Sequence, residues 1–308
     1  MTRLYEQCYM IRAFEKRVEE EFEKGVMRGT THGCIGQEII PVLTMNYVEK
    51  DKDVVTGTHR CHGQILAYTG DPFRLVSEMM GKKSGFNYGM GGSQHIKYEN
   101  YITNGVTGGM AAVGAGIAFS MKKKEGIVIS FLGDGGFQEG YVQETLNMAQ
   151  TFQVPILYIM ENNKYAMSTC TENVSSGTVQ SRVTAIGMQY NCTSSENIEE
   201  LDEKINKAFC FVRTERKPFF LEVQTFRLCG HSKSDEREYM TEDEKQKNAE
   251  NDPLLKLKRT LSLEKIRQIE GEIDLLIDDV FRRADKEQEM KFEDYQEVKK
   301  NADSITKL

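Results

Sequence analysis

Three short apolar segments, each followed by polar residues, constrain the fold of this 308-residue chain more than any other feature. A segment with helical character, residues 138–152, separates the first two, which are themselves too short to be buried helices. This order of strand, helix and strand predicts a parallel βαβ unit, and the third segment predicts a further strand. Ligands bind at the carboxyl ends of parallel strands, so we expect the site to lie among the polar residues that follow these segments. The apolar segments are IVISFL (127–132), VPILYIM (154–160) and FFLEVQT (219–225), and their polar continuations are Gly133-Asp134-Gly135, Glu161-Asn162-Asn163 and FRLCGHSKSD (226–235).

Periodicity and composition predict the remaining elements of an α/β chain. Apolar residues at spacings of three and four predict a helix over 4–24, ended by Gly25, and another over 263–284. The apolar face of the second helix must be covered, either by the chain's own core or by a partner subunit. The other predicted elements are a strand over 53–58, a glycine-rich loop over 81–93, a tightly packed helix over 108–121 and a charged, mobile loop over 233–252.

The bulk composition excludes several classes of function. Hydrophobic residues make up 39% and charged residues 28%, which is typical of soluble globular proteins. The net charge of −7 argues against nucleic acid as a partner. No apolar run approaches a membrane span, and the N-terminus lacks a signal-peptide layout. The seven cysteines form no CxxC pair and are odd in number, so they support neither a cysteine zinc site nor a disulfide framework, and we expect reduced thiols and a cytoplasmic location.

Asp134 and Asn163 are the residues from which a metal site can be argued. They lie 29 positions apart, each just beyond a predicted strand. If these strands are parallel neighbours, both side chains reach the same rim, where a carboxylate and an amide oxygen suit Mg²⁺. The glycines around Asp134 allow close approach of a phosphate, and a helix beginning near Gln138 would add its positive end. Gly-Asp-Gly alone favours a simple turn over a site, and only the pairing with Asn163 favours a site.

The segment GDGGFQEGYVQETLNMAQTFQVPILYIMENNKYAMST resembles the cofactor motif of the α subunits of thiamine-diphosphate-dependent 2-oxo acid dehydrogenases, and is most similar to bacterial pyruvate and acetoin dehydrogenases. The resemblance extends from about residue 3 to residue 290. It rests on several further blocks in the same order: RGTTHGCIGQE (28–38), GTHRCHG (57–63), GMGGSQH (89–95), NGVTGG (104–109) and FRLCGHSKSD (226–235).

The resemblance implies roles for individual residues. Mg²⁺ would be held by Asp134, Asn163 and the backbone carbonyl of Tyr165. His32 and His231 would be catalytic residues of the acyl-transfer channel, whereas His62 and His95 are interpreted as structural. The implied contacts with thiamine diphosphate are the N–H of Gly135 and the side chains of Arg60 and His231 at the diphosphate, backbone groups of Gly105 and Thr107 at the aminopyrimidine, and the further positions His59, Gly133 and Gly136.

The resemblance also implies a fold and partners. Residues 1–254 would form a three-layer thiamine-diphosphate-binding domain with a mostly parallel sheet, and residues 255–308 a C-terminal helical arm. The chain would assemble with a β subunit into a heterotetramer of two α and two β chains, decarboxylate pyruvate or cleave acetoin, and pass the acyl fragment to a lipoyl-bearing acyltransferase. Cys229 and Glu236 depart from the family pattern in the loop that guides the acceptor, so the resemblance defines the cofactor more narrowly than the acceptor.

Two other functions remain open at this stage. One is an enzyme with the same cofactor but a non-lipoyl acceptor, as in transketolase-like or biosynthetic acyl transfer. The other is a non-catalytic regulatory subunit, which the presence of Asp134, Asn163, Arg60 and His231 disfavours.

Overall fold

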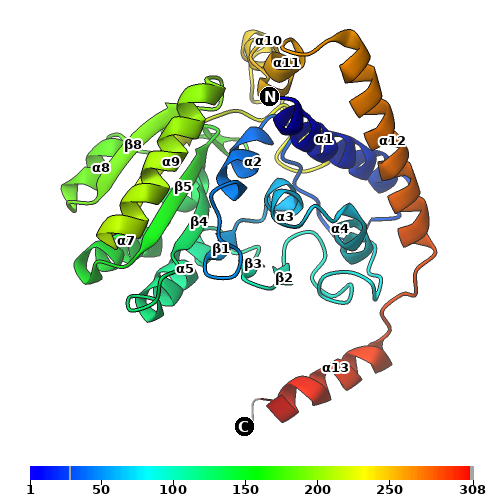
Figure 1. The fold of residues 1–308 in the computed structure, drawn as a ribbon, viewed down its shortest axis with the longest axis horizontal. Helices are drawn as coiled ribbons and strands as arrows, with labels where there is room; N and C mark the ends of the chain where they lie inside the picture. The colour runs from blue at the N-terminus through cyan, green and yellow to red at the C-terminus, as the bar shows by residue number, and fades with distance from the viewer. Residues whose placement is uncertain (28, 306–308) are drawn as a thin grey trace.

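A seven-stranded sheet forms the centre of the computed structural model, which describes residues 1–27 and 29–305 (Figure 1). Its strands are β1 (Val54–Gly57), β2 (Lys97–Tyr98), β3 (Tyr101–Thr103), β4 (Val128–Gly133), β5 (Ile156–Asn162), β8 (Gln189–Ser194) and β9 (Phe219–Gln224). The strand order is β2-β3-β1-β4-β5-β9-β8, and all neighbours pair in parallel except β2 and β3. Two further strands, β6 (Tyr165–Ala166) and β7 (Thr169–Cys170), form a separate antiparallel pair.

Helices pack on both faces of this sheet, so the three-layer α/β fold is confirmed (Figure 1). One face carries α5 (Gly109–Ser120), α7 (Gly140–Phe152) and α8 (Val179–Ala185), with the single turn α6 (Asp134–Phe137). The other core contains α1 (Thr2–Glu23), α2 (Ile39–Met45), α3 (His62–Thr69), α4 (Pro72–Met79), α9 (Ile198–Glu215) and α12 (Leu263–Asp285). The remaining helical segments are η1 (Thr171–Asn173), α10 (Glu242–Glu250), α11 (Pro253–Lys258) and α13 (Phe292–Ile305). None of the described helices combines the length and apolarity needed to cross a bilayer.

Alternate residues of the central strands enter two separate cores. Ile129 and Phe131 of β4 pack in the core that includes α1 and α9, whereas Val128 and Leu132 pack in the core that includes α5 and α7. Successive side chains of a strand point to opposite faces, so a strand covered on both faces must be apolar throughout. This requirement explains why the predicted strands are continuous apolar runs.

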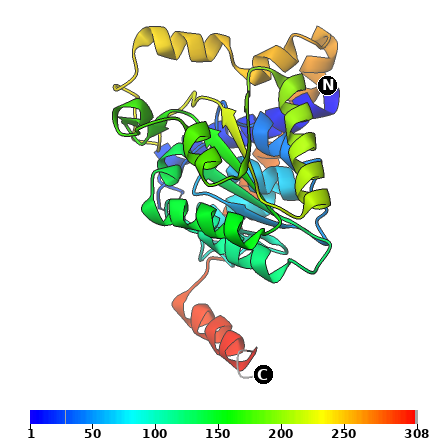
Figure 2. The same ribbon diagram turned by 90° about the vertical axis from the view of Figure 1, so that its left-hand side faces the viewer.

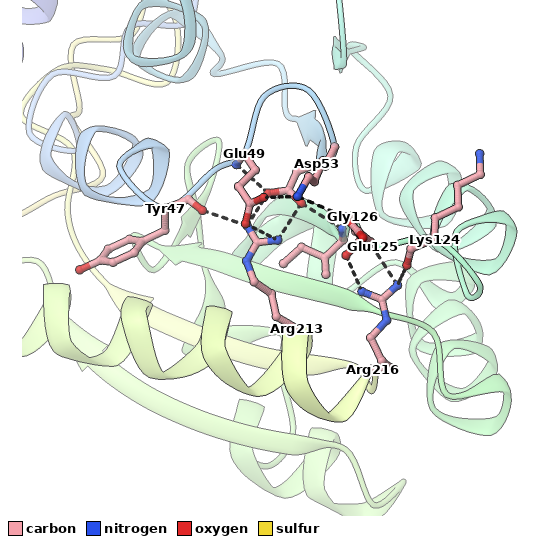
Figure 3. Close-up of polar contacts among 10 residues, drawn as sticks. Tyr47, Glu49, Asp53, Lys124, Glu125, Gly126, Arg213 and Arg216 are labelled. Carbon is pink, nitrogen blue, oxygen red and sulfur yellow. Dashed lines mark hydrogen bonds and ion pairs between the residues drawn. The ribbon is translucent and has the colours of Figure 1, made fainter.

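The end of the sheet opposite the predicted site is held by Arg213 of α9 and by Arg216, the residue that caps the carboxyl end of this helix (Figure 3). Arg213 Nη2 lies 2.6 Å from the Asp53 carboxylate and donates to the Tyr47 carbonyl at 3.0 Å. Asp53 is fully buried and also accepts from two backbone N–H groups. Arg216 donates to four carbonyls of the segment 121–126, which leads into β4. These contacts fix the amino ends of β1 and β4, and thereby position the opposite ends that form the site.

Two predicted segments differ from the structure. The charged segment 233–252 is not a loop throughout, because α10 occupies its second half. Thr241 caps this helix by accepting from Glu244 N at 3.2 Å, and three acidic residues occupy its first turn. Since α10 is polar on all sides, it has no apolar periodicity from which to predict it. The helix expected over 138–152 is α7, which begins at Gly140 after extended backbone at Glu139, and a separate single turn, α6, begins at Asp134 itself.

The predicted helix 263–284 is α12, and it packs on the chain's own core. Ile269, Ile273 and Ile277 are buried there, and Phe281 lies 5.5 Å from Phe14 of α1 between ring centroids. α13 follows and extends away from the body in both views (Figures 1 and 2). The predicted domain boundary at residue 254 falls within α11 and stays a prediction. Residue 28 of the first family block and residues 306–308 of the arm lie outside the described residues.

A buried ion-pair network joins α1 to the segments before α2 and α11. The Arg12 guanidinium contacts both carboxylate oxygens of Glu38 and lies 2.9 and 3.1 Å from those of Asp252. All three residues are less than one-tenth exposed. Because the charges are withdrawn from water, each depends on the others for compensation.

We expect Arg12→Met to lower the free energy of unfolding by about 3–5 kcal/mol, because it leaves two buried carboxylates without their cation. Urea unfolding monitored by circular dichroism measures this loss. The matched control is Arg17→Met on the same helix, where the ion pairs are partly exposed and the expected loss is below about 1 kcal/mol. Equal losses in the two variants would contradict the network's contribution.

Candidate active site

The carboxyl ends of the central strands meet around one cavity of about 360 Å³. β4 and β5 are paired in parallel along their length, with Gly133 opposite Glu161, so the segments that follow them lie side by side. All twelve residues that the resemblance assigns to the cofactor, the metal or catalysis line this cavity: His32, His59, Arg60, Gly105, Thr107, Gly133, Asp134, Gly135, Gly136, Asn163, Tyr165 and His231.

Oxygen atoms suited to a hard cation gather where β4 and β5 end. Asp134 and Asn163 are 3% and 8% exposed, so both side chains are withdrawn from bulk water. Asn163 donates from its amide nitrogen to Gln37 at 3.3 Å, which orients its oxygen, and Tyr165 N donates to that oxygen at 3.2 Å. Carboxylate, amide and carbonyl oxygens are the donors that Mg²⁺ takes from proteins.

The surroundings of Asp134 fit a bound cation. Its carboxylate accepts from the Thr171 hydroxyl at 3.1 Å and from Gly135 N at 2.9 Å, and among the described residues it has no salt-bridge partner. Burial raises the pKa of Asp134, and the hydrogen bonds from Thr171 and Gly135 only partly oppose this. A divalent cation would supply the missing positive charge and favour the ionised form.

Glycines let the loops at this rim approach one another. Gly108, which precedes α5, has a φ of +73°, and a Cβ there would lie 2.7 Å from a methyl group of Val142. A Cβ on Gly135 would lie 2.8 Å from that of Ala166. At Gly133, by contrast, an added Cβ meets nothing within 4 Å, because this backbone faces open space. The result is a backbone cradle that a side chain would fill, the arrangement that phosphate binding needs.

Arg60 connects the segment after β1 with the loop after β9. Its guanidinium donates to the Gly33 carbonyl and lies 3.4 Å from both Nδ1 and the carbonyl oxygen of His231. The carboxylate of Asp235 accepts from His231 N at 2.6 Å, from Arg237 N and from the Tyr239 hydroxyl, which holds the loop in place. Arg60 is only 7% exposed, so its charge acts on the cavity with little screening.

His32, His59 and His231 form a cluster in the wall of the cavity. Ring centroids lie 4.8 Å apart for His32 and His59, 4.9 Å for His32 and His231, and 5.5 Å for His59 and His231. Burial, assisted by the Arg60 charge, lowers the pKa of His32 to about 3, of His59 to about 2 and of His231 to about 4. All three imidazoles are therefore neutral near pH 7.

Several cavity residues were not among the predicted site residues. Glu161 is 6% exposed, lies directly before the Asn162-Asn163 pair and accepts from Gln64 at 3.2 Å. Gln37 orients Asn163, and Gln94 donates to His32 Nδ1 at 3.2 Å. Glu161, Gln37 and Gln94 each lie within a sequence block that carries the family resemblance, and this location was the only sign in the sequence that they belong to the site.

His62 lies outside the cavity, in a buried hydrogen-bonded chain. Its Nδ1 lies 3.0 Å from the Glu15 carboxylate and its Nε2 lies 2.7 Å from the Ser93 hydroxyl. Glu15 also accepts from Cys34 N at 2.8 Å. The residues of this chain are almost completely buried, which fits the interpretation of His62 as structural. His95 is exposed and accepts from Gly105 N at 3.4 Å.

A family model described as "Dehydrogenase E1 component" matches residues 6–293. The chain belongs to this family. It is an α chain of a 2-oxo acid dehydrogenase, an enzyme that depends on thiamine diphosphate with Mg²⁺ as the usual metal. Thiamine diphosphate supplies the electron sink that stabilises negative charge after bond cleavage at the substrate carbonyl, while the protein supplies binding and orientation.

Curated relatives of this chain carry the name "Pyruvate dehydrogenase E1 component subunit alpha". The protein of Zymomonas mobilis is 33% identical over 268 residues, which cover 85% of this chain and 76% of the relative. The protein of Rhizobium meliloti is 30% identical over 298 residues, with 92% and 85% covered. The mitochondrial protein of Saccharomyces cerevisiae is 32% identical over 268 residues, with 85% and 63% covered.

The buried acid Glu161 gives a testable dependence of stability on pH. Burial raises the pKa of Glu161 from 4.5 to about 7, with Arg60 opposing the shift. The folded chain thus holds the proton more tightly than the unfolded chain, and ionisation destabilises the fold progressively as pH rises between these values. Glu161→Gln removes this cost and still offers Gln64 an acceptor. We expect it to stabilise the cofactor-free chain by at most about 3 kcal/mol at pH 8 and hardly at all at pH 4.

Urea unfolding at the two pH values measures the difference between variant and wild type. Glu144→Gln, on the exposed side of α7, is the matched control and should leave stability unchanged at both. A gain for Glu161→Gln that is equal at pH 4 and pH 8 would show that ionisation is not its cause.

Proposed function

We propose that this chain is the α subunit of a dehydrogenase that decarboxylates pyruvate and transfers the acyl fragment to a lipoyl group. The name shared by the relatives supports pyruvate over acetoin. The single observation that carries the catalytic proposal is the gathering of Asp134, Asn163 and Tyr165 with Arg60 and His231 around one cavity. A regulatory subunit without catalytic function would not need this buried donor set.

The residue roles follow from the chemistry of each group. Asp134, Asn163 and the Tyr165 carbonyl would hold Mg²⁺, and Gly135 N, Arg60 and His231 would bind the diphosphate. Backbone groups of Gly105 and Thr107 would hold the aminopyrimidine. The remaining proposed contacts with the cofactor are His59, Gly133 and Gly136.

His32 and His231 are proposed to act as hydrogen-bond donors in the cavity. Nδ1 of His32 accepts from Gln94, and Nδ1 of His231 faces Arg60. In the neutral ring this leaves the proton on Nε2 of each histidine. Each Nε2–H can then stabilise negative charge on a phosphate or on the reacting carbonyl oxygen, and can deliver a proton during acyl transfer.

Membership as an E1 α chain implies a β subunit and a lipoyl-bearing acyltransferase as partners. The assembly of two α and two β chains is our proposal, and so is the cytoplasmic location. The division into a cofactor domain (1–254) and a helical arm (255–308) is proposed as well. The competing activity, transfer to a non-lipoyl acceptor, differs in the acceptor alone and is separated from our proposal by assay.

The function is tested with the chain reconstituted with its β subunit, thiamine diphosphate and Mg²⁺. We expect CO₂ release from pyruvate and acylation of a lipoyl domain, with weaker activity on longer 2-oxo acids and on acetoin. A reconstituted enzyme that decarboxylates pyruvate onto a dye but never acylates any lipoyl domain would favour the non-lipoyl alternative. Absence of turnover with every 2-oxo acid would sink the proposal.

Metal and diphosphate binding are tested separately by calorimetry on the same assembly. Asp134→Ala removes the charged metal donor, so we expect the binding heat of thiamine diphosphate with Mg²⁺ to disappear. Arg60→Ala removes a charged hydrogen bond worth roughly 1.5–3 kcal/mol, which corresponds to about tenfold to hundredfold weaker binding. The control ligand is thiamine without its diphosphate, whose affinity Arg60→Ala should not change.

A further inference from the structure

The three clustered histidines offer a donor set that Mg²⁺ does not use. One ring nitrogen from each of His32, His59 and His231 can be chosen so that all three lie within 4.8 Å of one another. Imidazole nitrogen suits late first-row cations such as Zn²⁺, Co²⁺ and Cu²⁺, whereas Mg²⁺ prefers oxygen. The cavity thus contains oxygen donors at the ends of β4 and β5, and imidazole nitrogens on the segments before α2, after β1 and after β9.

We propose that His32, His59 and His231 form a binding site for a late first-row divalent cation, with Zn²⁺ as the best match. Three neutral imidazoles with a fourth position open toward a cavity is a donor arrangement that zinc accepts in proteins.

The geometry needs only local adjustment. Tetrahedral bonds of about 2.0–2.1 Å place neighbouring nitrogens about 3.4 Å apart, so the rings must close by roughly 1.5 Å at most. Within the described chain His59 makes no hydrogen bond, and the contact of His231 with Arg60 is at the limit of a hydrogen bond at 3.4 Å. Gln94 holds His32 through Nδ1, and turning its amide over would let it accept from Nδ1–H and free Nε2 for the metal.

The protonation of the rings also favours a metal. Their pKa values lie well below neutrality, so no proton has to be displaced from an imidazolium at pH 7. The positive charge of Arg60 opposes a cation at this place. A bound cation would therefore repel Arg60 and draw His231 away from the position in which both would meet a diphosphate.

The cation would consequently compete with the cofactor. This consequence rests on the proposed function, because it requires that Arg60 and His231 bind the diphosphate of thiamine diphosphate. Binding of the cation to the cofactor-free chain requires only the three histidines. The two parts of the inference are therefore measured separately.

The probe for the site itself is Co²⁺, titrated into the cofactor-free chain in the presence of excess Mg²⁺. We expect one equivalent to give the intense visible absorption of four-coordinate Co²⁺, and Zn²⁺ to abolish it. Single variants His32→Gln, His59→Gln and His231→Gln should each weaken Co²⁺ binding by at least about tenfold, the loss that even an outer-shell partner of a metal ligand can cause.

Two controls exclude other donors. His95→Gln alters an exposed histidine outside the cluster, and Cys210→Ser removes the exposed thiol, so neither should change the absorption. Co²⁺ binding that survives all three cluster variants, or that is lost with Cys210→Ser, would overturn the site. Circular dichroism of each variant verifies that folding is retained.

Competition is measured by repeating the Co²⁺ titration after addition of thiamine diphosphate, with thiamine as the matched control. We expect the diphosphate form alone to weaken Co²⁺ binding by at least about tenfold. Co²⁺ binding that depends on the three histidines but is unaffected by thiamine diphosphate would leave the metal site intact and contradict the diphosphate role proposed for Arg60 and His231. The two failures are thereby distinguishable.

Discussion

The parallel pairing of β4 with β5 is the constraint on which the site depends. Their register places Gly133 opposite Glu161, so the polar residues after each strand emerge at one rim. Because side chains alternate along a strand, a slip of one residue would exchange the faces of Asn162 and Asn163. At the far end Arg213 and Arg216 hold the segments that lead into β1 and β4, and two apolar cores cover both faces of the sheet.

The cavity has two regions of opposite charge, one around Asp134 and one around Arg60, and each would be stabilised by a ligand group of the opposite sign. Asp134 is a buried carboxylate without a salt-bridge partner among the described residues, and it lies where oxygen donors gather. Arg60 is a buried guanidinium beside three neutral imidazoles. A magnesium diphosphate carries a cation and an anion in one unit, and it would compensate both regions together. Among the described residues neither group has a salt-bridge partner, although Arg227 acts on Asp134 and Arg60 acts on Glu161 through space.

The sequence predicted the parts of the fold whose signal is local. Continuous apolar runs marked β4, β5 and β9, and the spacing of Asp134 and Asn163 placed both at one rim. β8 was not predicted, because residues 189–194 (QYNCTS) are mostly polar and show no apolar run. α10 was predicted as loop because a helix that is polar all round lacks periodicity, even though Thr241 caps it.

The other residues of the site were harder to predict from the sequence than the two metal donors. The roles of the histidines and of Arg60 rested on resemblance, since their segments are far apart in the sequence. That His32, His59 and His231 touch one another follows only from the path of the chain through the fold. Glu161 was passed over because a single acid after a strand has no distinctive pattern, and its significance comes from burial.

Helix α1 makes polar contacts both with α12 and with segments next to the cavity. Along one side it is bonded to α12, through Tyr5 to Glu270 and Tyr9 to Asp274. On another side the Glu15 carboxylate contacts His62 and accepts a hydrogen bond from Cys34 N. Cys34 follows Gly33, and the carbonyl of Gly33 accepts a hydrogen bond from Arg60. Because one helix makes both sets of contacts, a shift of α1 would change the contacts with α12 and those near the cavity together. Force applied to α12 by a bound protein would reach the wall of the cavity as a displacement of Gly33 and Arg60, without any contact between that protein and the cavity.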